Sequence, residues 1–412
     1  MNRRVAITGL GAVAPLGNNV DALFSQLVAG RSGIRRLASI RTERLLAPIG
    51  APADFDPAEH FAPVRLRMLD RVSQLALMAA AQATADARLD FGAEARERCG
   101  VSVGTSMGGV KTTDEAYYAL YGEHSERVQP LNVVAAMSNA PAAWIGIDYG
   151  LSGPILTYST ACSSSAVAIG EAARRIAAGD VDVVLAGGCE APLTFGVLRA
   201  WEAMRTLASV DPTDASTSCR PFSHDRTGLV IGEGAAFVTL EDWGHASARG
   251  ASIYGELTGY GLTSDVAHIT KPTVEGQGNA MRAALRSAGL DPGDIDYINA
   301  HGTATVQNDA IETAAIKDVF GAHAYTIPVS STKSMHGHLL GAAGALEFVI
   351  AVKTLIRGIV PPTLHLTTPD PVCDLDYVPN RARIGLALRS VMSNSFAFGG
   401  TNAVLIVQSA RP

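Results

Sequence analysis

The sequence is poor in lysine and has no long apolar run. Only five of its 33 basic residues are lysines and the net charge is −6, so no basic stripe dominates and a nucleic-acid binder is excluded. No window approaches the ~18 uninterrupted apolar residues of a membrane span. The start "MNRR" leads into "VAITGLGAVAPLG", which is typical of a strand and a glycine turn rather than of an export segment. We therefore expect a cytoplasmic protein without a membrane span.

Cysteine is also scarce, and its spacing excludes two further classes of protein. The five cysteines are odd in number, scattered and without a CxxC pair: Cys99, Cys162, Cys189, Cys219 and Cys373. This pattern favours reduced thiols over disulfides or a zinc site, so no metal is predicted. A buried cysteine commonly acts as a small apolar residue, and we interpret all of them except Cys162 in this way.

What the chain has in abundance is short apolar runs that alternate with alanine-rich runs. The runs "DVVLAGGCEA" and "DYINAHGTAT" are typical of strands, whereas "SSAVAIGEAARRIAAG" and "GALEFVIAVKTLIRG" are typical of helices. The alternation predicts an α/β fold with buried, largely parallel sheets. With 412 residues, 47% of them hydrophobic, the chain is too long for one ordinary core, and two domains or two fused halves are expected.

Two stretches of the chain have the same organisation. In "SSSAVAIGEAARRIAAGDVDVV" and "GAAGALEFVIAVKTLIRGIVPP", small residues precede an apolar helix that a glycine ends. Cys162 stands just before the first stretch, and Lys333 and His338 before the second. The helix from Ala345 to Ile356 is apolar nearly all round, which favours burial on several sides. The sequence therefore predicts two similar halves, residues 1–250 and 251–412, with helices buried between sheets.

Cys162 differs from the other cysteines in its position. It lies in "YSTACSSSAVAIGEAARRIAAGD", immediately before a helix that begins near Ser163–Ser165. A helix N-terminus carries partial positive charge and free N–H groups, which lower a thiol pKa and can hold a developing oxyanion. This junction predicts a nucleophilic cysteine.

Two of the ten histidines stand where α/β proteins place chemistry. His301 follows a strand in "NAHGTAT", and His338 precedes a glycine- and alanine-rich helix start in "STKSMHGHLLGAAGALE". Small residues at such junctions let backbone and ligand approach closely. Together with Cys162, the two histidines indicate a catalytic group rather than hydrogen-bonded core residues.

Several stretches of the chain together resemble a known family. The stretches "TACSSS", "NAHGTAT", "STKSMHGHLLGAAGALE" and "SNSFAFGGTNA" occur in the order and spacing of β-ketoacyl-acyl-carrier-protein synthases, most closely the type II elongating branch. "RRVAITGLGAVAPLGN", "RPFSHDRTGLVIGEGA" and "TSDVAHITKP" extend the resemblance over essentially the whole chain. The resemblance implies the thiolase fold, in which two duplicated halves form five α-β-α-β-α layers and enclose the active site between them.

The resemblance also implies a reaction. Cys162 takes an acyl chain as a thioester from the phosphopantetheine arm of an acyl carrier protein, and His301 and His338 polarise the malonyl thioester. Loss of CO₂ leaves a carbanion that attacks the acyl group, while backbone N–H groups of Cys162 and Phe398 hold the oxyanion. Splitting the reaction through an acyl-enzyme is nucleophilic catalysis, and no cofactor is required.

Further residues match functional positions of the family. Lys333 matches its active-site lysine and Glu312 the acidic partner of that lysine, which predicts a buried pair. The family's pantetheine-binding positions correspond to Thr303, Thr305 and Thr270. Its gating positions correspond to Phe398, Ala397 and Gly399, with Asp265 and His268 on a second loop. Its acyl-tunnel position corresponds to Met107, and its carrier-docking positions correspond to Arg65, Arg67 and Arg205.

Four positions depart from the elongating synthases. Val306 and Asn308 replace a proline and a glycine, Ala397 replaces the first glycine of FGFGG, and His336 adds an imidazole. Such changes favour a polyene or polyketide pathway, in which the active subunit often pairs with a paralogue that lacks the cysteine. Fatty-acid elongation, a homodimer, a non-catalytic chain-length partner and a degradative thiolase are the alternatives. The intact Cys162, His301 and His338 weigh against the partner, and no second cysteine stands in a thiolase motif.

Overall fold

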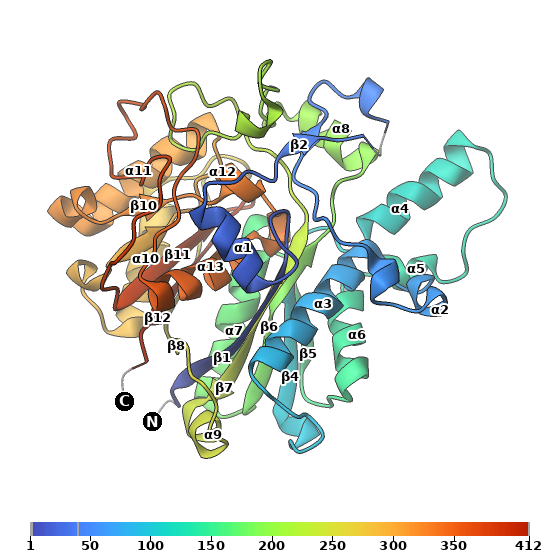
Figure 1. Cartoon of the computed structure of the whole chain (residues 1–412), viewed down its shortest axis with the longest axis horizontal. Coiled ribbons are helices and arrows are strands. Elements are labelled where there is room, and N and C mark those ends of the chain that lie inside the picture. The colour runs from blue at the N-terminus through green and yellow to red at the C-terminus, as the bar shows by residue number, and fades with distance from the viewer. Residues whose placement is uncertain (1–2, 39–40, 411–412) are drawn as a thin grey trace.

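The computed structural model describes residues 3–38 and 41–410 and shows a mixed sheet surrounded by helices (Figure 1). The strands are β1 Val5–Val13, β2 Arg35–Arg36, β3 Ile49–Gly50, β4 Cys99–Gly104, β5 Ile155–Tyr158, β6 Val183–Glu190, β7 Gly234–Asp242, β8 Gly255–Ser264, β9 Tyr297–Asn299, β10 Val329–Ser330, β11 Ser390–Phe396 and β12 Thr401–Gln408. The helices are α1 Val20–Val28, α2 Pro63–Leu66, α3 Arg71–Asp86, α4 Val110–Tyr117, α5 Asn132–Ala136, α6 Ala140–Tyr149, α7 Ser164–Ala178, α8 Phe195–Ala203, α9 Trp243–Ala248, α10 Val274–Ala288, α11 Val306–Phe320, α12 Lys333–His336 and α13 Ala343–Arg357.

The main sheet contains the same five-stranded arrangement twice. One half has the order β1-β7-β6-β4-β5 and the other the order β8-β12-β11-β9-β10. In each half the first two pairings are antiparallel and the last two are parallel. A two-residue antiparallel ladder between β1 and β8 joins the halves. The duplication predicted from the sequence is therefore present in the topology.

The expectation of largely parallel sheets is wrong. Half of the pairings inside the repeats are antiparallel, because β7 and β12 each run against both of their neighbours. Strands β1, β4, β6 and β11 are nevertheless buried at every residue, since helices cover both faces of the sheet. Burial on both faces removes the alternation that would have revealed the direction of each strand. The division at residue 250, in the turn between α9 and β8, stays a prediction.

The helices complete five layers, as the resemblance implied. Helices α3 and α6 cover the outer face of the first half-sheet, α10 and α11 cover the second, and α7 and α13 lie between the two (Figure 1). Both central helices are buried along most of their length and end at left-handed glycines, Gly179 with φ +82° and Gly358 with φ +61°. The layer between the sheets is thus built from the two stretches whose similarity was visible in the sequence.

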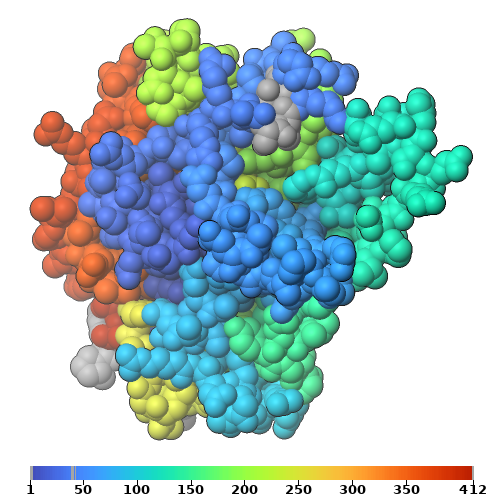
Figure 2. Space-filling model, turned by 45° about the vertical axis from the view of Figure 1, so that its right-hand side comes forward, coloured from blue at the N-terminus to red at the C-terminus, as the bar shows by residue number. Residues whose placement is uncertain are grey.

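The segment from α4 to α5 stands out from this layered body (Figures 1 and 2). It carries exposed apolar side chains, among them Tyr121 and Val133 at 77% and 75% exposure. The neighbouring strand β5 forms one edge of the main sheet. Within the described residues, no helix combines the length and apolarity that crossing a membrane needs.

Candidate active site

The predicted nucleophile, Cys162, lies at a strained turn between β5 and α7. Ala161, in the 3₁₀ turn Ala161–Ser163, has φ +51°, a left-handed value that is unusual for a residue with a Cβ. Helix α7 starts so close to the sheet that a Cβ added to Gly104 would lie 2.2 Å from the backbone nitrogen of Ser165. A Cβ on Gly188 would lie 2.4 Å from the Ser165 Cβ. These glycines let the sheet support the turn that presents Cys162.

The pKa of Cys162 moves in the opposite direction to the prediction. The side chain is almost fully buried, and burial raises its pKa to about 12, although the Lys333 ammonium and the N–H groups of Phe398 and Cys162 act to lower it. The helix terminus is present as expected, but desolvation of a thiolate outweighs it. The expectation of a lowered pKa is therefore wrong for the resting site, where the thiol is neutral.

His301 is held by its backbone at the end of β9. The N–H groups of His301 and Gly302 donate to the two carboxylate oxygens of Glu312, each at 2.8 Å. Lys333 Nζ donates to the His301 carbonyl at 2.7 Å and lies 3.5 Å from His301 Nδ1. The loop after β9 is thus fixed by a carboxylate on one side and an ammonium on the other.

The predicted pair of Lys333 with Glu312 is wrong. Lys333 and Glu347 form the ion pair, and both side chains are fully buried. Glu312 instead accepts the two backbone N–H groups of the His301 turn and an N–H of Asn394 at 3.2 Å. A carboxylate with several such donors is satisfied without a cation, so it is Glu347, on α13, that compensates the lysine.

His338 is placed by its backbone alone. Its N–H donates to the Val230 carbonyl at 2.6 Å, and its carbonyl accepts from the Gly232 N–H at 2.9 Å. Neither ring nitrogen has a hydrogen-bond partner among residues 3–38 and 41–410. The ring is buried with both nitrogens free, which is how a donor reserved for a substrate would be presented.

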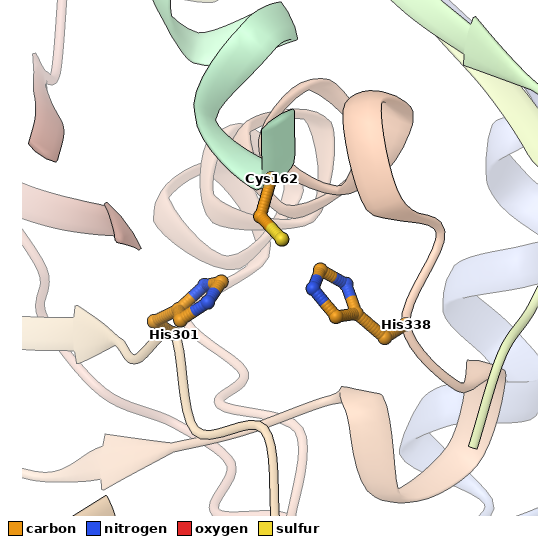
Figure 3. A group of neighbouring side chains, drawn as sticks. All are labelled: Cys162, His301 and His338. Carbon is orange, nitrogen blue, oxygen red and sulfur yellow. The ribbon is translucent and has the colours of Figure 1, made fainter. Parts of the chain in front are cut away.

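The three predicted reacting groups converge in space (Figure 3). One side-chain atom from each of Cys162, His301 and His338 lies within 4.8 Å of the others, and the two imidazoles are edge to face with centroids 5.4 Å apart. Burial and the nearby Lys333 charge hold the pKa of both imidazoles well below its ordinary value. Both rings are therefore neutral, and the same ammonium opposes a metal cation at this thiol–imidazole set.

A loop that follows β11 closes over the sulfur. Gly399 and Gly400 have φ +83° and +81°, and a Cβ on Gly400 would lie 1.9 Å from the Asp265 carbonyl oxygen. The Asp265 N–H donates to the Gly400 carbonyl at 2.7 Å, and the Gly399 N–H to the Ile269 carbonyl at 2.7 Å. The predicted gate loop thus docks on the loop that carries Asp265.

The remaining predicted gate residues belong to the same arrangement. The Phe398 ring stacks on Trp201 of α8, with centroids 6.0 Å apart and an interplanar angle of 22°. The φ angle of Ala397 is not positive, so an alanine side chain is compatible with the backbone at this position. His268 accepts the Thr270 N–H through Nδ1 at 3.1 Å, which orders the second loop.

A cavity of about 350 Å³ leads to the three predicted reacting groups. Its wall includes Cys162, His301 and His338 and the three predicted pantetheine residues, Thr270, Thr303 and Thr305. The Thr303 and Thr305 hydroxyls are hydrogen-bonded to each other at 2.9 Å. Arg205, an exposed residue with φ +56°, also lines this cavity. These residues, predicted from the resemblance, therefore line one cavity.

Three other predicted residues lie outside this wall, within the described part of the chain. Met107 is not among the lining residues, and its N–H donates to Glu190 at 3.1 Å. Arg65 forms an ion pair with Asp148, while Arg67 on the same short stretch is exposed. The acyl-tunnel role of Met107 and the docking role of the two arginines remain predictions.

Sequence reasoning missed two buried carboxylates and gave His336 no role. Glu347 lies in "GALEFV" and Glu190 ends "AGGCE", and a single acid in an apolar run was the available signal for both. His336 is not a substrate group, because its ring bonds the Gly337 carbonyl at 2.7 Å and the Thr332 hydroxyl at 2.9 Å. Asn308, which replaces a glycine, is bonded by Gln277 at 3.2 Å and serves the packing of α10 against α11.

Comparison with known proteins agrees with this geometry. The β-ketoacyl synthase N-terminal domain matches residues 2–246, and the C-terminal domain of the same family matches residues 254–367. The chain is 45% identical to nodulation protein E of Rhizobium meliloti strain 1021 over 98% of the chain and 99% of that protein. It is 42% identical to 3-oxoacyl-[acyl-carrier-protein] synthase 2 of Staphylococcus aureus strain COL over 98% of each.

Solved structures show the same likeness. The ishigamide ketosynthase/chain length factor aligns with a TM-score of 0.93 and 34% identity over all of both chains. A type II polyketide ketosynthase, bound to a hexaketide and in complex with its acyl-carrier protein, aligns with a TM-score of 0.92 and 32% identity over all of both chains. The chain therefore belongs to the β-ketoacyl synthase family. It is an acyltransferase with the thiolase-like fold of that family.

Proposed function

We propose that the protein condenses a Cys162-bound acyl chain with a malonyl unit, and that both arrive on the phosphopantetheine arm of an acyl carrier protein. The observation that carries this proposal is the convergence of one thiol and two neutral imidazoles at the inner end of a cavity lined by threonines. In the first step the Cys162 sulfur–acyl bond forms, the carrier's thioester bond breaks, and the thiol proton leaves with the carrier thiol.

In the second step the malonyl carboxyl group leaves as CO₂. Its bonding electrons pass to the enolate, whose oxygen the N–H groups of His301 and His338 stabilise. The carbanion attacks the acyl carbonyl, the new carbon–carbon bond forms, and the Cys162 sulfur leaves and regains a proton. The N–H groups of Cys162 and Phe398 face this sulfur and would hold the oxyanion of the attack.

The cavity suits an arm that carries amides and a phosphate. Thr303 and Thr305 present hydroxyls to the tunnel, Thr270 stands on the opposing loop, and Arg205 adds a cation. The proposed reaction uses only these protein groups and the substrates on the carrier arm, so no further cofactor is required. The polyketide ketosynthase of the same fold is bound by its acyl-carrier protein, which supports this partner for the chain.

The pathway is fatty-acid or polyketide elongation, and relatives of both kinds cover the whole chain. The similar ishigamide protein is a ketosynthase with a chain length factor, which supports a dimer, with an identical or a paralogous subunit. The exposed apolar side chains near α4 and the free edge at β5 offer a surface for it. We place the protein in the cytoplasm, since all five cysteines are unpaired.

The test separates the two half-reactions. Cys162→Ala should acquire no acyl mass and form no product, yet it should still release CO₂ from malonyl-carrier protein, because both imidazoles remain. His301→Ala and His338→Ala should decarboxylate about 10²-fold more slowly, as for loss of a donor to an oxyanion, while at least one still acquires an acyl mass. Intact mass spectrometry and CO₂ release are the measurements. Product formation by Cys162→Ala, or parental decarboxylation in both histidine variants, contradicts the scheme.

A further inference from the structure

Glu190 is a fully buried carboxylate at the end of β6 that the reaction itself does not use. Burial raises its pKa, and hydrogen bonds act against that rise. No lysine, arginine or histidine pairs with it in the part of the chain that the structure describes. A buried carboxylate without a cation is costly, so what its oxygens bind is informative.

Its oxygens join three segments that are distant in sequence. One oxygen accepts from the Thr105 hydroxyl and the Met107 N–H, both at 3.1 Å. The other accepts from the Ser106 N–H at 2.7 Å and its hydroxyl, and from the Gly341 N–H at 2.9 Å. The carboxylate therefore ties the loop after β4 and the start of the α13 region to the end of β6.

Gly341 lies three residues after His338, and the turn between them is strained. Leu340 is buried with φ +47°, and such a conformation persists only where its surroundings hold it. A Cβ on Gly341 would lie 2.5 Å from a Glu190 oxygen and 2.4 Å from the Ser106 nitrogen. The contact with Glu190 therefore depends on a glycine at this position.

His338 depends on such backbone contacts more than His301 does. The His301 turn is bonded by Glu312 and Lys333, and the His301 ring lies near Nζ of that lysine. The His338 ring has no partner among the described side chains or backbone groups, so its place follows from the backbone on each side. On one side this is the bridge to Ile231, and on the other it is the turn that Gly341 fastens to Glu190.

We propose that Glu190 is a positioning residue, which holds the His338 turn against the sheet that carries Cys162. The proposal rests on the decarboxylating role of His338 in the proposed function. Glu190→Gln keeps the shape of the side chain, but either amide orientation turns an NH₂ toward backbone N–H groups that can only donate. The turn should then shift, and a displacement of ~1 Å at a catalytic group costs up to about 10²-fold in rate.

The experiment is a double-mutant cycle in the Cys162→Ala background, with CO₂ release from malonyl-carrier protein as the readout. Glu190→Gln should slow decarboxylation about tenfold or more, by the same sensitivity to misplacement. It should slow it further when combined with His301→Ala, and it should have no further effect when combined with His338→Ala. Thr105→Val removes a donor from the other oxygen, leaves the Gly341 contact intact, and serves as the matched control with at most a small loss.

The outcomes separate the positioning role of Glu190 from the proposed function. If Glu190→Gln leaves CO₂ release unchanged, or lowers it equally in both histidine backgrounds, the positioning role is wrong and only packing is involved. If His338→Ala decarboxylates at the parental rate while His301→Ala does not, the positioning role fails because His338 has no decarboxylating role. If both histidine variants decarboxylate at the parental rate, the proposed function fails instead. Should Glu190→Gln not fold, Gly341→Ala breaks the same contact from the opposite side and enters the same cycle, with the same two contradicting results.

Discussion

At the scale of single residues, the active site is governed by desolvation. Cys162, His301 and His338 are each nearly or fully buried, and for all three burial is the largest cause of the change in pKa. Desolvation favours the neutral form of a thiol and of an imidazole alike. The resting site is therefore uncharged at the atoms proposed to react, and the fully buried Lys333–Glu347 ion pair lies beside it.

The histidines should stay neutral well below the usual titration range. Because their pKa is lowered, protonation begins only at a pH below about 6.5, the ordinary histidine value. NMR of ¹⁵N-histidine-labelled protein should show neutral-imidazole shifts for both from pH 8 to 5.5. His245 is the internal control, since it lies between Glu94 and Glu241 at 2.9 and 2.8 Å and its pKa is raised. Titration of His301 or His338 alongside or above His245 would contradict this assignment.

At the scale of elements, short loops rather than long helices complete the site. The nucleophile stands between β5 and α7, His301 follows β9, His338 precedes α13, and the gate joins β11 to β12. Each of these loops is fixed by a close approach or a buried group: Gly104 and Gly188 at Ser165, Glu312 at His301, Glu190 at Gly341, and Gly400 at Asp265. Loops held in this way place reacting atoms more precisely than their lack of regular structure suggests.

The two glycines of the gate offer a matched comparison. Alanine at either position must adopt a left-handed φ, which costs roughly 1–2 kcal/mol. A Cβ at Gly400 would also overlap the Asp265 carbonyl, whereas nothing lies within 4 Å of one at Gly399. We expect Gly400→Ala to slow acyl transfer to Cys162 about tenfold or more by undocking the loop, and Gly399→Ala to slow it only a few-fold. Time-resolved intact mass measures both, and equal rates would show that the Asp265 contact does not control the gate.

At the scale of the whole molecule, the two halves place one site between them. Cys162 comes from the first five-stranded unit and both histidines from the second, and α7 and α13 pack against each other in the layer between. The cavity reaches this layer from a rim that includes Arg205, on a protein whose net charge is −6. A negatively charged partner would therefore be attracted by local rather than overall charge.

Charge reversal should separate a docking arginine from a structural one. Arg205→Glu should raise KM for malonyl-carrier protein several-fold while kcat changes little, and salt should diminish the difference, because steering charges act mainly before binding. Arg286→Glu, an exposed change in the last turn of α10, is the matched control. Arg65→Glu places like charges beside Asp148 and should lower the melting temperature. An unchanged KM for Arg205→Glu at low salt would remove Arg205 from the docking surface.

The architecture and a set of candidate reacting groups could both be predicted from the printed chain. Cys162, His301 and His338 were recognisable because each stands at a junction of short apolar strands with small-residue helix starts, which is a local pattern. The repeated helix in two stretches likewise revealed the duplication. Such features depend on neighbours within a few residues, and the printed chain contains them.

The directions of the strands, the protonation of the site and the pairing of charged side chains could be read only from the folded structure. Strand directions, the raised pKa of Cys162, the choice of Glu347 over Glu312 by Lys333, and the pairing of Arg65 with Asp148 all depend on contacts between distant segments. Burial on both faces erased the alternation that would have shown strand direction, and the balance between desolvation and a helix terminus has no local signature. In the sequence Glu190 is a lone acid after two glycines and a cysteine. Its role could not be predicted, because it depends on the hydrogen bond from Gly341, which is distant in the sequence.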